Sequence, residues 1–491
     1  MKRALLILLV AILTLVGILA FRAQVVPSRQ PEAEAVAELA IDEEAVLSRF
    51  AQSLTFPTVS SQGGTEDGTP FLQFHEFLRT AFPGVHAGLE VETVNDLSLL
   101  FTWRGSDPSL DPAVLMGHFD VVPVIPGSEG DWEHPPYGGV IADGYVWGRG
   151  SMDDKGTVMA ALEGVERLLA DGFTPRRTLY LAFGHDEEIG GEEGARVIVA
   201  TLEKRGVKRL AFVLDEGGAI GEGIIPGIDG AVAVIGIAEK GGVTLTLTVE
   251  GPGGHSSAPP AQTNIGVLAS AITRLEADPF PTSLSGASRQ LFEFLGPEMS
   301  FGQRLVVNNL WLFEPLVVWG MSGEPSARST IQTTTAATII KGGVKSNVLP
   351  TRATAEVNFR ILPGETPDTV AERVRTVVDD DRVVVSGAED GREPSPVSRT
   401  DSEAFSLLGR TIRETAGTDV LVAPYLVTGG TDARHFAGLS ENVYRFTPMR
   451  FTGDAMTRIH GTNERLGAGS FLAYVRFFHR LVQNLDTLPE G

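Results

Sequence analysis

Cysteine is absent from the sequence, which excludes disulfides, thiolate nucleophiles and thiolate metal ligands. Basic residues are outnumbered: 40 Lys and Arg stand against 62 Asp and Glu, for a formal net charge of −22. Because a nucleic-acid partner requires a basic surface, this balance argues against nucleic acid. The remaining composition, 43% hydrophobic and 21% charged over 491 residues, predicts a globular protein of two or more domains.

A long hydrophobic run without charges occupies the N-terminus. Lys2 and Arg3 precede an apolar segment from Ala4 to Phe21, which would be roughly 27 Å long as a helix. The run is longer than a typical signal-peptide core and no clear A-x-A site follows it, so we favour a membrane anchor over a cleaved signal. The basic residues before the run and the acidic residues after it predict that the rest of the chain lies outside the cytoplasm. We expect residues 1–22 to form the anchor and 23–44 a tether; secretion after signal cleavage is the alternative.

Apolar strand patterns alternate with amphipathic helix patterns after the tether. The segment "RTLYLAFGH" is typical of a buried strand, and "GTVMAALEGVERLLADG" of a helix that ends at a glycine. Such alternation predicts an α/β fold with a mixed, mostly parallel sheet covered by helices. We assign residues 45–240 and 396–491 to this α/β domain, which later motifs make the candidate catalytic domain.

The pattern changes between residues 241 and 395, which we interpret as an inserted domain. Strictly alternating strands such as "VTLTLTVE" and the order βαββαβ predict a small two-layer unit with one open sheet face. An apolar, aromatic segment containing "LWLFEPLVVWGM" interrupts this order. We expect it to pack as extra helices on the open sheet face. The alternative is that it forms an apolar wall that binds a hydrophobic substrate.

Acidic and histidine side chains follow the ends of several predicted strands of the catalytic domain. Sites in open α/β sheets form at the carboxyl ends of strands, and two histidines with several carboxylates suit zinc or a related divalent ion. Clustered acids repel each other unless cations lie among them. The residues concerned are His118, Asp120, Asp153, Glu187, Glu188, Asp215 and His460.

The joint order of these motifs resembles the zinc aminoacylase and carboxypeptidase metallopeptidase family. The stretches "GHFDVVPV", "WGRGSMDDKG", "GHDEEIGG", "LDEGG", "GPGGHSSAPP" and "GGTDARHF" are similar to its carboxypeptidase S-like branch, which also contains N-fatty-acyl-amino acid synthases/hydrolases. The resemblance covers roughly residues 45–487. It implies a di-zinc exopeptidase fold in which the inserted domain serves as a lid or dimerisation domain.

The resemblance also implies roles for individual residues at a site with two Zn²⁺ ions. His118, Asp153 and Asp215 would hold one ion, and Asp153, Glu188 and His460 the other, with Asp153 and a water bridging the pair. Glu187 would act as general base, and Asp120 would orient His118. The peptide bond between Asp153 and Asp154 is expected to be cis.

Substrate-binding positions follow from the same resemblance. His255 is expected to stabilise the oxyanion of the tetrahedral intermediate. Arg360 is expected to bind a free substrate carboxylate through two hydrogen bonds, although a strand-surface charge is an equal interpretation. The other expected contacts are Asn347, Gly429, Gly430, Thr431 and Arg434.

Together these features predict a zinc-dependent amidohydrolase that cleaves a peptide or N-acyl amide bond next to a free carboxylate. An N-fatty-acyl amino acid hydrolase/synthase is the alternative within the same chemistry. A non-catalytic binding ectodomain is the alternative of another class, and the presence of all the expected ligands together with Glu187 argues against it. A homodimer formed through the inserted domain is a further expectation.

Overall fold

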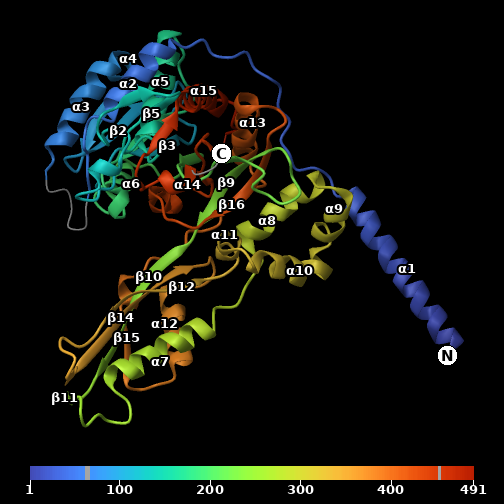
Figure 1. Ribbon diagram of the computed structural model, residues 1–491. Coiled ribbons are helices and arrows are strands. Elements are labelled where there is room, and N and C mark those ends of the chain that lie inside the picture. Colours follow the sequence, from blue (N-terminus) through green and yellow to red (C-terminus); the bar gives the residue numbers. More distant parts are fainter. Residues whose placement is uncertain (61–66, 452–454, 491) are drawn as a thin grey trace.

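A computed structural model of the chain describes residues 1–60, 67–451 and 455–490. Figure 1 shows a helix-covered body, an elongated second lobe that extends from it, and a helix, α1 (Lys2–Val25), that projects outward alone. In the part of the chain that is described, α1 is long and apolar enough to cross a membrane, and only 6% of its hydrophobic window is buried.

The body is organised around a mixed sheet with the strand order β1-β2-β6-β3-β7-β17-β9-β8-β18, in which β16 pairs with β9. The central strands β6, β3, β7 and β17 are parallel neighbours, whereas β1 and β2 add antiparallel pairs at one edge. The strands are β1 (Glu90–Val94), β2 (Ser98–Trp103), β3 (Ala113–His118), β6 (Leu179–Gly184), β7 (Phe212–Asp215), β8 (Ile220–Glu222), β9 (Ala231–Glu239), β16 (Leu421–Val427), β17 (Val443–Arg445) and β18 (Arg450–Phe451).

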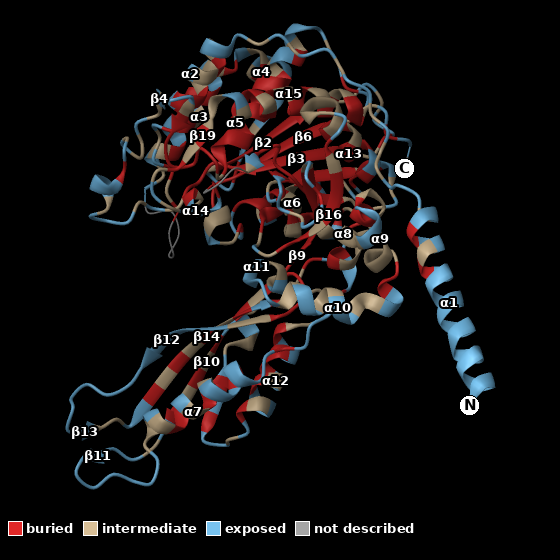
Figure 2. Cartoon of the chain, turned by 45° about the vertical axis from the view of Figure 1, so that its right-hand side comes forward, coloured by how far each residue is buried: buried red, intermediate tan, exposed pale blue. Residues whose placement is uncertain are grey.

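Helices cover both faces of this sheet, which explains why its strands are almost continuously apolar. On β6, Leu179, Leu181 and Phe183 enter the larger core, whereas Tyr180 and Ala182 enter a smaller core on the opposite face. Figure 2 shows the resulting buried centre. The larger core is covered by α2 (Glu43–Ser53), α3 (Thr69–Ala81), α4 (Pro83–Gly88), α5 (Lys155–Ala170), α13 (Glu403–Ala416) and α15 (Ala468–Leu485), and the smaller by α6 (Ala195–Lys204) and η5 (Asp432–Gly438). The predicted α/β fold is confirmed.

The second lobe is the predicted βαββαβ insertion. Its separate sheet has the order β12-β14-β10-β15, and inward-facing residues of β10 such as Val243 and Leu245 pack against two helices. Most residues of β12 are exposed, so one face of the sheet is partly open. Its elements are β10 (Gly241–Glu250), β11 (Gly254–His255), α7 (Asn264–Ala277), β12 (Thr334–Lys341), β13 (Val348–Leu349), β14 (Arg352–Ile361), α12 (Pro367–Val378) and β15 (Val383–Ser386).

The apolar segment inside the insertion does not pack on that open face, so this expectation was wrong. It forms α8 (Gly286–Leu295), α9 (Phe301–Val307), α10 (Leu310–Ser322) and α11 (Pro325–Ser329). Helix α8 contacts β16 and β9 of the body, and α9 contacts α1. Phe294 and Leu295 of α8 join the larger core, where Phe294 packs edge-on against Phe405.

A small sheet of order β19-β5-β4 completes the body beside the strand ends. It consists of β4 (Val140–Ala142), β5 (Tyr145–Trp147) and β19 (Arg465–Gly467), and α14 (Ala455–Arg458) precedes β19. Because β19 pairs with β5, the loop that carries His460 lies beside the loop that carries Asp153. Short 3-10 turns occur at η1 (Glu129–Asp131), η2 (Glu187–Ile189), η3 (Gly296–Glu298) and η4 (Ala388–Asp390).

Candidate metal centre and active site

Three neighbouring parallel strands deliver histidine and carboxylate side chains to one edge of the large sheet. His118 ends β3, the turn η2 follows β6 and carries Glu187 and Glu188, and Asp215 ends β7. His118 is buried and lies in the middle, because β3 pairs with both β6 and β7. Its Nε2 atom is 3.0 Å from Asp153 Oδ1 and 3.9 Å from Glu187 Oε2.

Asp153 lies between the two histidines. Its Oδ1 atom faces His118, while its Oδ2 atom is 3.0 Å from His460 Nε2. The same His460 nitrogen is 3.1 Å from Glu188 Oε2. The structure therefore brings His118, Asp153, Glu188 and His460 together, with one carboxylate in contact with both imidazoles. The expected cis peptide bond between Asp153 and Asp154 is present.

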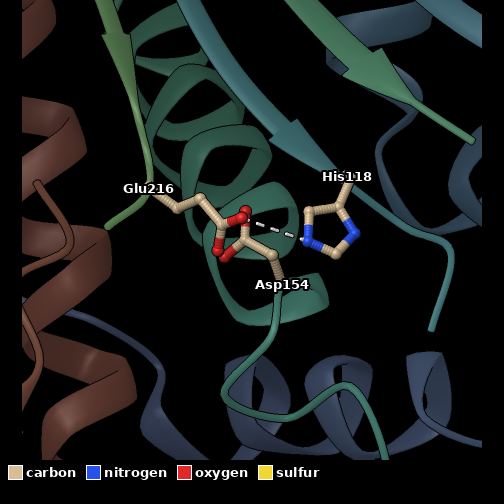
Figure 3. Close-up of side chains that lie close together, drawn as sticks. All are labelled: His118, Asp154 and Glu216. Carbon is tan, nitrogen blue, oxygen red and sulfur yellow. Dashed lines mark ion pairs between the residues drawn. The ribbon is translucent and has the colours of Figure 1, made fainter. Parts of the chain in front are cut away.

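The two adjacent acids after β7 have different surroundings. Glu216 Oε1 lies 3.3 Å from His118 Nε2, and Figure 3 shows Glu216 and Asp154 beside that imidazole. Asp215 instead accepts a 2.7 Å hydrogen bond from the backbone N–H of Ala433. The expectation from sequence named Asp215 and overlooked Glu216, because both follow the same strand and the pattern does not show which side chain turns into the site.

Asp120 connects the histidine to the acidic turn. His118 Nδ1 lies 3.0 Å from the Asp120 carbonyl oxygen and 3.2 Å from its Oδ1. The backbone N–H groups of Glu187 and Glu188 each donate to the Asp120 carboxylate at 3.2 Å, and Ser60 Oγ donates to it at 2.5 Å. Asp120 thus occupies the Nδ1 side of the imidazole, and Nε2 faces Asp153, Glu187 and Glu216.

A buried ion pair fixes the two loops that carry Asp153 and His460. Glu464 accepts hydrogen bonds from the backbone N–H groups of Met152 and Asp153 at 2.8 and 3.3 Å. Its other oxygen accepts from Arg149 Nη1 at 2.7 Å, and Arg149 Nη2 donates to the His460 carbonyl at 3.3 Å. Sequence reasoning missed both residues, although they lie within the motifs "WGRGSMDDKG" and "IHGTNE".

The centre carries more negative than positive charge, and the pKa values reflect this. Burial raises the pKa of Glu187 well above its usual value, and it raises the pKa of Glu216 to about 8. Burial alone would lower the pKa of His118, but the neighbouring Glu216, Asp120 and Asp153 outweigh it and hold that pKa well above the usual value. Hydrogen bonds with Asp153 and Glu188 raise the pKa of His460 to about 10. Cations placed among these acids would relieve the repulsion between them.

The donor set fits divalent metal ions. The ligand atoms of His118, Asp154 and Glu216 all lie within 4.8 Å of one another, as do those of His118, Asp153 and Glu188. Among the described residues, Glu188 Oε1 is buried without a hydrogen-bond partner, and both Asp154 carboxylate oxygens are buried. Buried carboxylate oxygens require a partner, and imidazole and carboxylate ligands without sulfur are typical of zinc and related ions.

The loop after β16 borders this centre. The Thr431 N–H and Oγ1 both donate to Glu239 Oε2, at 3.0 and 2.9 Å. Arg434 Nη1 donates to the Thr431 carbonyl at 2.9 Å, and its Nη2 contacts the Gly190 carbonyl. Arg434 thus ties the loop of Gly429, Gly430 and Thr431 to the turn that follows Glu187 and Glu188.

Arg392, like Arg149, is a basic residue near the centre that sequence reasoning missed. It lies in the polar segment "EDGREPSP", at the predicted boundary between the inserted domain and the second part of the catalytic domain. Its Nη1 donates to Glu239 Oε1 at 3.2 Å and its Nη2 to the Lys240 carbonyl at 3.2 Å. Burial lowers the pKa of Arg392, and the charges of Glu239, Arg434, Arg360 and Glu187 also act on it. Arg360, Arg434 and Glu187 are therefore close enough to Arg392 for their charges to act on it.

His255 and Asn347 lie at the tip of the lid, away from the strand ends that carry His118 (Figure 1). His255 is exposed on β11, and its Nδ1 atom is 2.7 Å from Ser257 Oγ. The Asn347 carbonyl accepts from the N–H of Ser256 at 3.1 Å. Within this single chain, neither residue is brought to the metal centre.

Fold and site together define a metal-dependent hydrolase of the lidded exopeptidase type. The sequence model of peptidase family M20/M25/M40 matches residues 114–484, and the chain belongs to this family. It is 42% identical to "Probable carboxypeptidase S-like 2" of Dictyostelium discoideum, over 94% of this chain and 90% of the relative. It is 40% identical to "N-fatty-acyl-amino acid synthase/hydrolase PM20D1" of Xenopus tropicalis, over 98% of this chain and 94% of the relative.

Solved structures show the same fold at low identity. An M20 family metallo-carboxypeptidase from Sulfolobus solfataricus has a TM-score of 0.63 and 18% identity, over 91% of this chain and all of that chain. Human carnosine dipeptidase 1 has a TM-score of 0.62 and 16% identity, over 91% of this chain and 97% of that chain. The expected family, fold and enzyme class are confirmed: the chain is a metal-dependent amidohydrolase.

Proposed function

We propose that this enzyme uses two Zn²⁺ ions to hydrolyse a peptide or N-acyl amide bond next to a free carboxylate. The single observation that carries the proposal is the position of Glu187 beside a cluster of metal-type ligands, with a basic region next to it. An acid that is free to move protons and a cationic region for a carboxylate are what this reaction needs.

We assign one ion to His118, Asp153 and Glu216, and the other to Asp153, Glu188 and His460. Asp153 serves both, which its two oxygens in contact with separate histidines support. Bound divalent ions lower the pKa of water and polarise a carbonyl. In this assignment Glu216 takes the role that the resemblance gave to Asp215, and Asp215 holds the backbone at Ala433 instead.

Glu187 moves the proton in this proposal. Its carboxylate accepts a proton from the attacking water and then donates it to the leaving nitrogen. Asp120 keeps Glu187 in place by accepting its backbone N–H, and the same carboxylate lies beside His118 Nδ1. Gly191 allows the chain to turn three residues after Glu188, because it has a φ of 66° and a Cβ there would lie 1.9 Å from Asp432 Oδ1.

Arg360, Arg392 and Arg434 form the proposed region for the substrate carboxylate. Arg392 and Arg434 are both held by backbone carbonyls, whereas Arg360 is exposed on β14 and has its charge available for a ligand. The loop of Gly429, Gly430 and Thr431 would contact the substrate beside them.

Long-chain N-acyl amino acids are the second candidate substrate class. The relatives that are 40–41% identical and named N-fatty-acyl-amino acid synthase/hydrolase favour it. Both classes share the amide bond and the adjacent carboxylate, so the same catalytic groups serve either.

We further propose a homodimer in which the lid of a second copy brings His255 and Asn347 to the metal centre. Their exposed position at the lid tip supports this arrangement. For location, we propose that α1 anchors the enzyme in a membrane with the catalytic body outside the cytoplasm. The exposure of its apolar residues supports anchoring, and secretion after removal of this segment is the alternative.

A substrate panel tests the proposed reaction. A dipeptide and a long-chain N-acyl amino acid are each compared with the matching compound whose carboxylate is replaced by a neutral amide. We expect turnover of at least one carboxylate compound, loss of turnover after chelation, and recovery with Zn²⁺. Equal turnover of the neutral amides would contradict carboxylate recognition, and chelator-resistant turnover would contradict a metal-dependent reaction.

A further inference from the structure

The outer face of α10 is apolar and exposed. Trp311, Leu312, Leu316 and Trp319 have exposed fractions of 57%, 40%, 50% and 76%. At about 100° of rotation per residue, these four side chains share one side of the helix. The charged residue of α10, Glu314, is paired with Arg289 at 2.8 Å. A helix that is apolar all around is normally covered on every side, so this face calls for a partner.

The inner face of α10 is fixed to the rest of the molecule. Leu310 forms a small apolar cluster with Leu284 and Ile331, and Val317, Val318 and Met321 pack against it. Leu310, Val317 and Met321 lie on the side of the helix opposite Leu312, Leu316 and Trp319. The outer face is therefore held in place as an exposed surface, and Figure 2 shows most of α10 in the colours of intermediate and exposed residues.

The exposed face begins beside the apolar run of α1. Asn309, immediately before α10, donates from Nδ2 to the Leu19 carbonyl at 3.1 Å. Arg22 donates from Nη2 to the Asn308 carbonyl at 3.5 Å. Leu19 and Ala23 are the buried residues of α1. The first turn of α10 is thus level with the end of the hydrophobic run of α1, and both views show the two helices at the same side of the body (Figures 1 and 2).

The length of α10 determines how it can meet a membrane. Its 13 residues span about 20 Å, too short to cross a bilayer core. Helix α9 precedes it at an angle of 104°, so the pair does not form one straight span. A short apolar helix at this depth suits the boundary between lipid headgroups and acyl chains, where tryptophan is enriched.

We propose that the outer face of α10 inserts into the surface of the membrane that α1 crosses, as a second lipid contact that sets the orientation of the catalytic body. This inference rests on the proposed anchoring by α1. A bilayer is the occupant favoured over a second copy of the chain because the exposed face begins level with the end of the hydrophobic run of α1, where Asn309 contacts the Leu19 carbonyl.

The tryptophans of the chain permit a direct test. Of the five tryptophans, Trp103, Trp132 and Trp147 are buried in the body, so quenching by lipid reports on the two in α10. The full chain is reconstituted in phosphatidylcholine vesicles whose acyl chains are brominated near the headgroup. We expect bromolipid to quench the emission and aqueous iodide to have little effect. Replacing both residues (Trp311→Phe and Trp319→Phe) should abolish the bromolipid quenching.

A charged variant separates α10 from α1. Leu316→Glu should lose bromolipid quenching and gain iodide quenching, yet still float with the vesicles through α1 and hydrolyse a soluble substrate at the normal rate. The matched control is Leu72→Glu, at a leucine of α3 that is 56% exposed, which should leave the fluorescence unchanged.

Three outcomes would overturn the inference. Wild-type chain that floats while its tryptophans remain open to iodide and unquenched by bromolipid would show that α10 stays in water. Protection from both quenchers, together with concentration-dependent cross-linking, would show that a second copy covers the face. A chain that does not float would overturn the anchoring itself, and hydrolysis of soluble substrate in that sample would show that the proposed reaction stands independently.

Discussion

Separate substitutions of Glu216 and Asp215 test whether Glu216 binds a metal ion while its neighbour Asp215 stabilises the fold. Glu216 Oε1 lies 3.3 Å from His118 Nε2 and faces the metal-type ligands. Glu216→Gln keeps the shape of the side chain but replaces a charged oxygen ligand by a neutral amide. Substitution of residues that only support a ligand typically weakens metal binding by roughly 10- to 100-fold, so loss of a ligand should exceed that range and release one ion.

Asp215→Asn should act on stability instead. The carboxylate accepts the buried N–H of Ala433 at 2.7 Å, and an asparagine can turn its own NH₂ group toward that donor. An unsatisfied buried polar group costs about 1–3 kcal/mol. We expect a decrease of that size in the free energy of unfolding while both ions are retained.

Metal content after dialysis against a chelator and urea unfolding in detergent measure the two effects on the same samples. Loss of an ion from the Asp215→Asn variant, with both ions kept by the Glu216→Gln variant, would refute the assignment. It would restore the ligand set that the sequence suggested.

Three further predictions concern other parts of the molecule. Asp153→Ala should lose both ions, because its two oxygens contact separate histidines; normal metal content would reject the bridging role. Arg360→Gln should raise KM for a free-carboxylate substrate by roughly 10- to 100-fold with metal content unchanged, whereas an unchanged KM would leave Arg360 a surface charge. Burial lowers the pKa of Lys240 to about 8, against roughly 10.4 in an unfolded chain. The unfolded chain therefore binds more protons between these values, so the wild-type free energy of unfolding should rise by about 3 kcal/mol across that window relative to Lys240→Met. The prediction would be contradicted if the free energies of unfolding of the wild type and of Lys240→Met changed with pH in the same way.

Strand patterns made much of the metal centre predictable. Buried strands such as "RTLYLAFGH" end at the same edge of a parallel sheet, so the residues that follow them must meet there. His118, Glu188 and the general location of the acids after β7 follow from this rule. The choice between Asp215 and Glu216 does not, because the direction of a side chain just beyond a strand depends on the loop that packs against it.

Tertiary contacts determined the features that the sequence did not reveal. The polar segment around Arg392 is typical of a linker, yet Glu239 and a backbone carbonyl hold this arginine beside the centre. Glu464 is buried because it satisfies the N–H groups of the Asp153 loop. The apolar segment of α8 to α10 was predicted to be helical, but the surface on which it packs is set by the shape of the body.

The proposed membrane contact of α10 would affect how substrates reach the enzyme. If its outer face lies at the lipid surface, the catalytic body is held at a fixed orientation instead of turning freely on the tether. Amphiphilic substrates that partition into the membrane would then approach the enzyme from one side.

The most direct test of the central claim measures turnover and metal content together in a Glu187→Gln variant. Glu187 lies 3.9 Å from His118 Nε2 and has no assigned role as a metal ligand, so we expect the variant to bind the same two ions per chain as the wild type. Loss of the proton-transferring group should lower kcat by roughly 10²- to 10⁴-fold on a substrate with a free carboxylate. Full turnover by a variant that retains its metal would contradict the account.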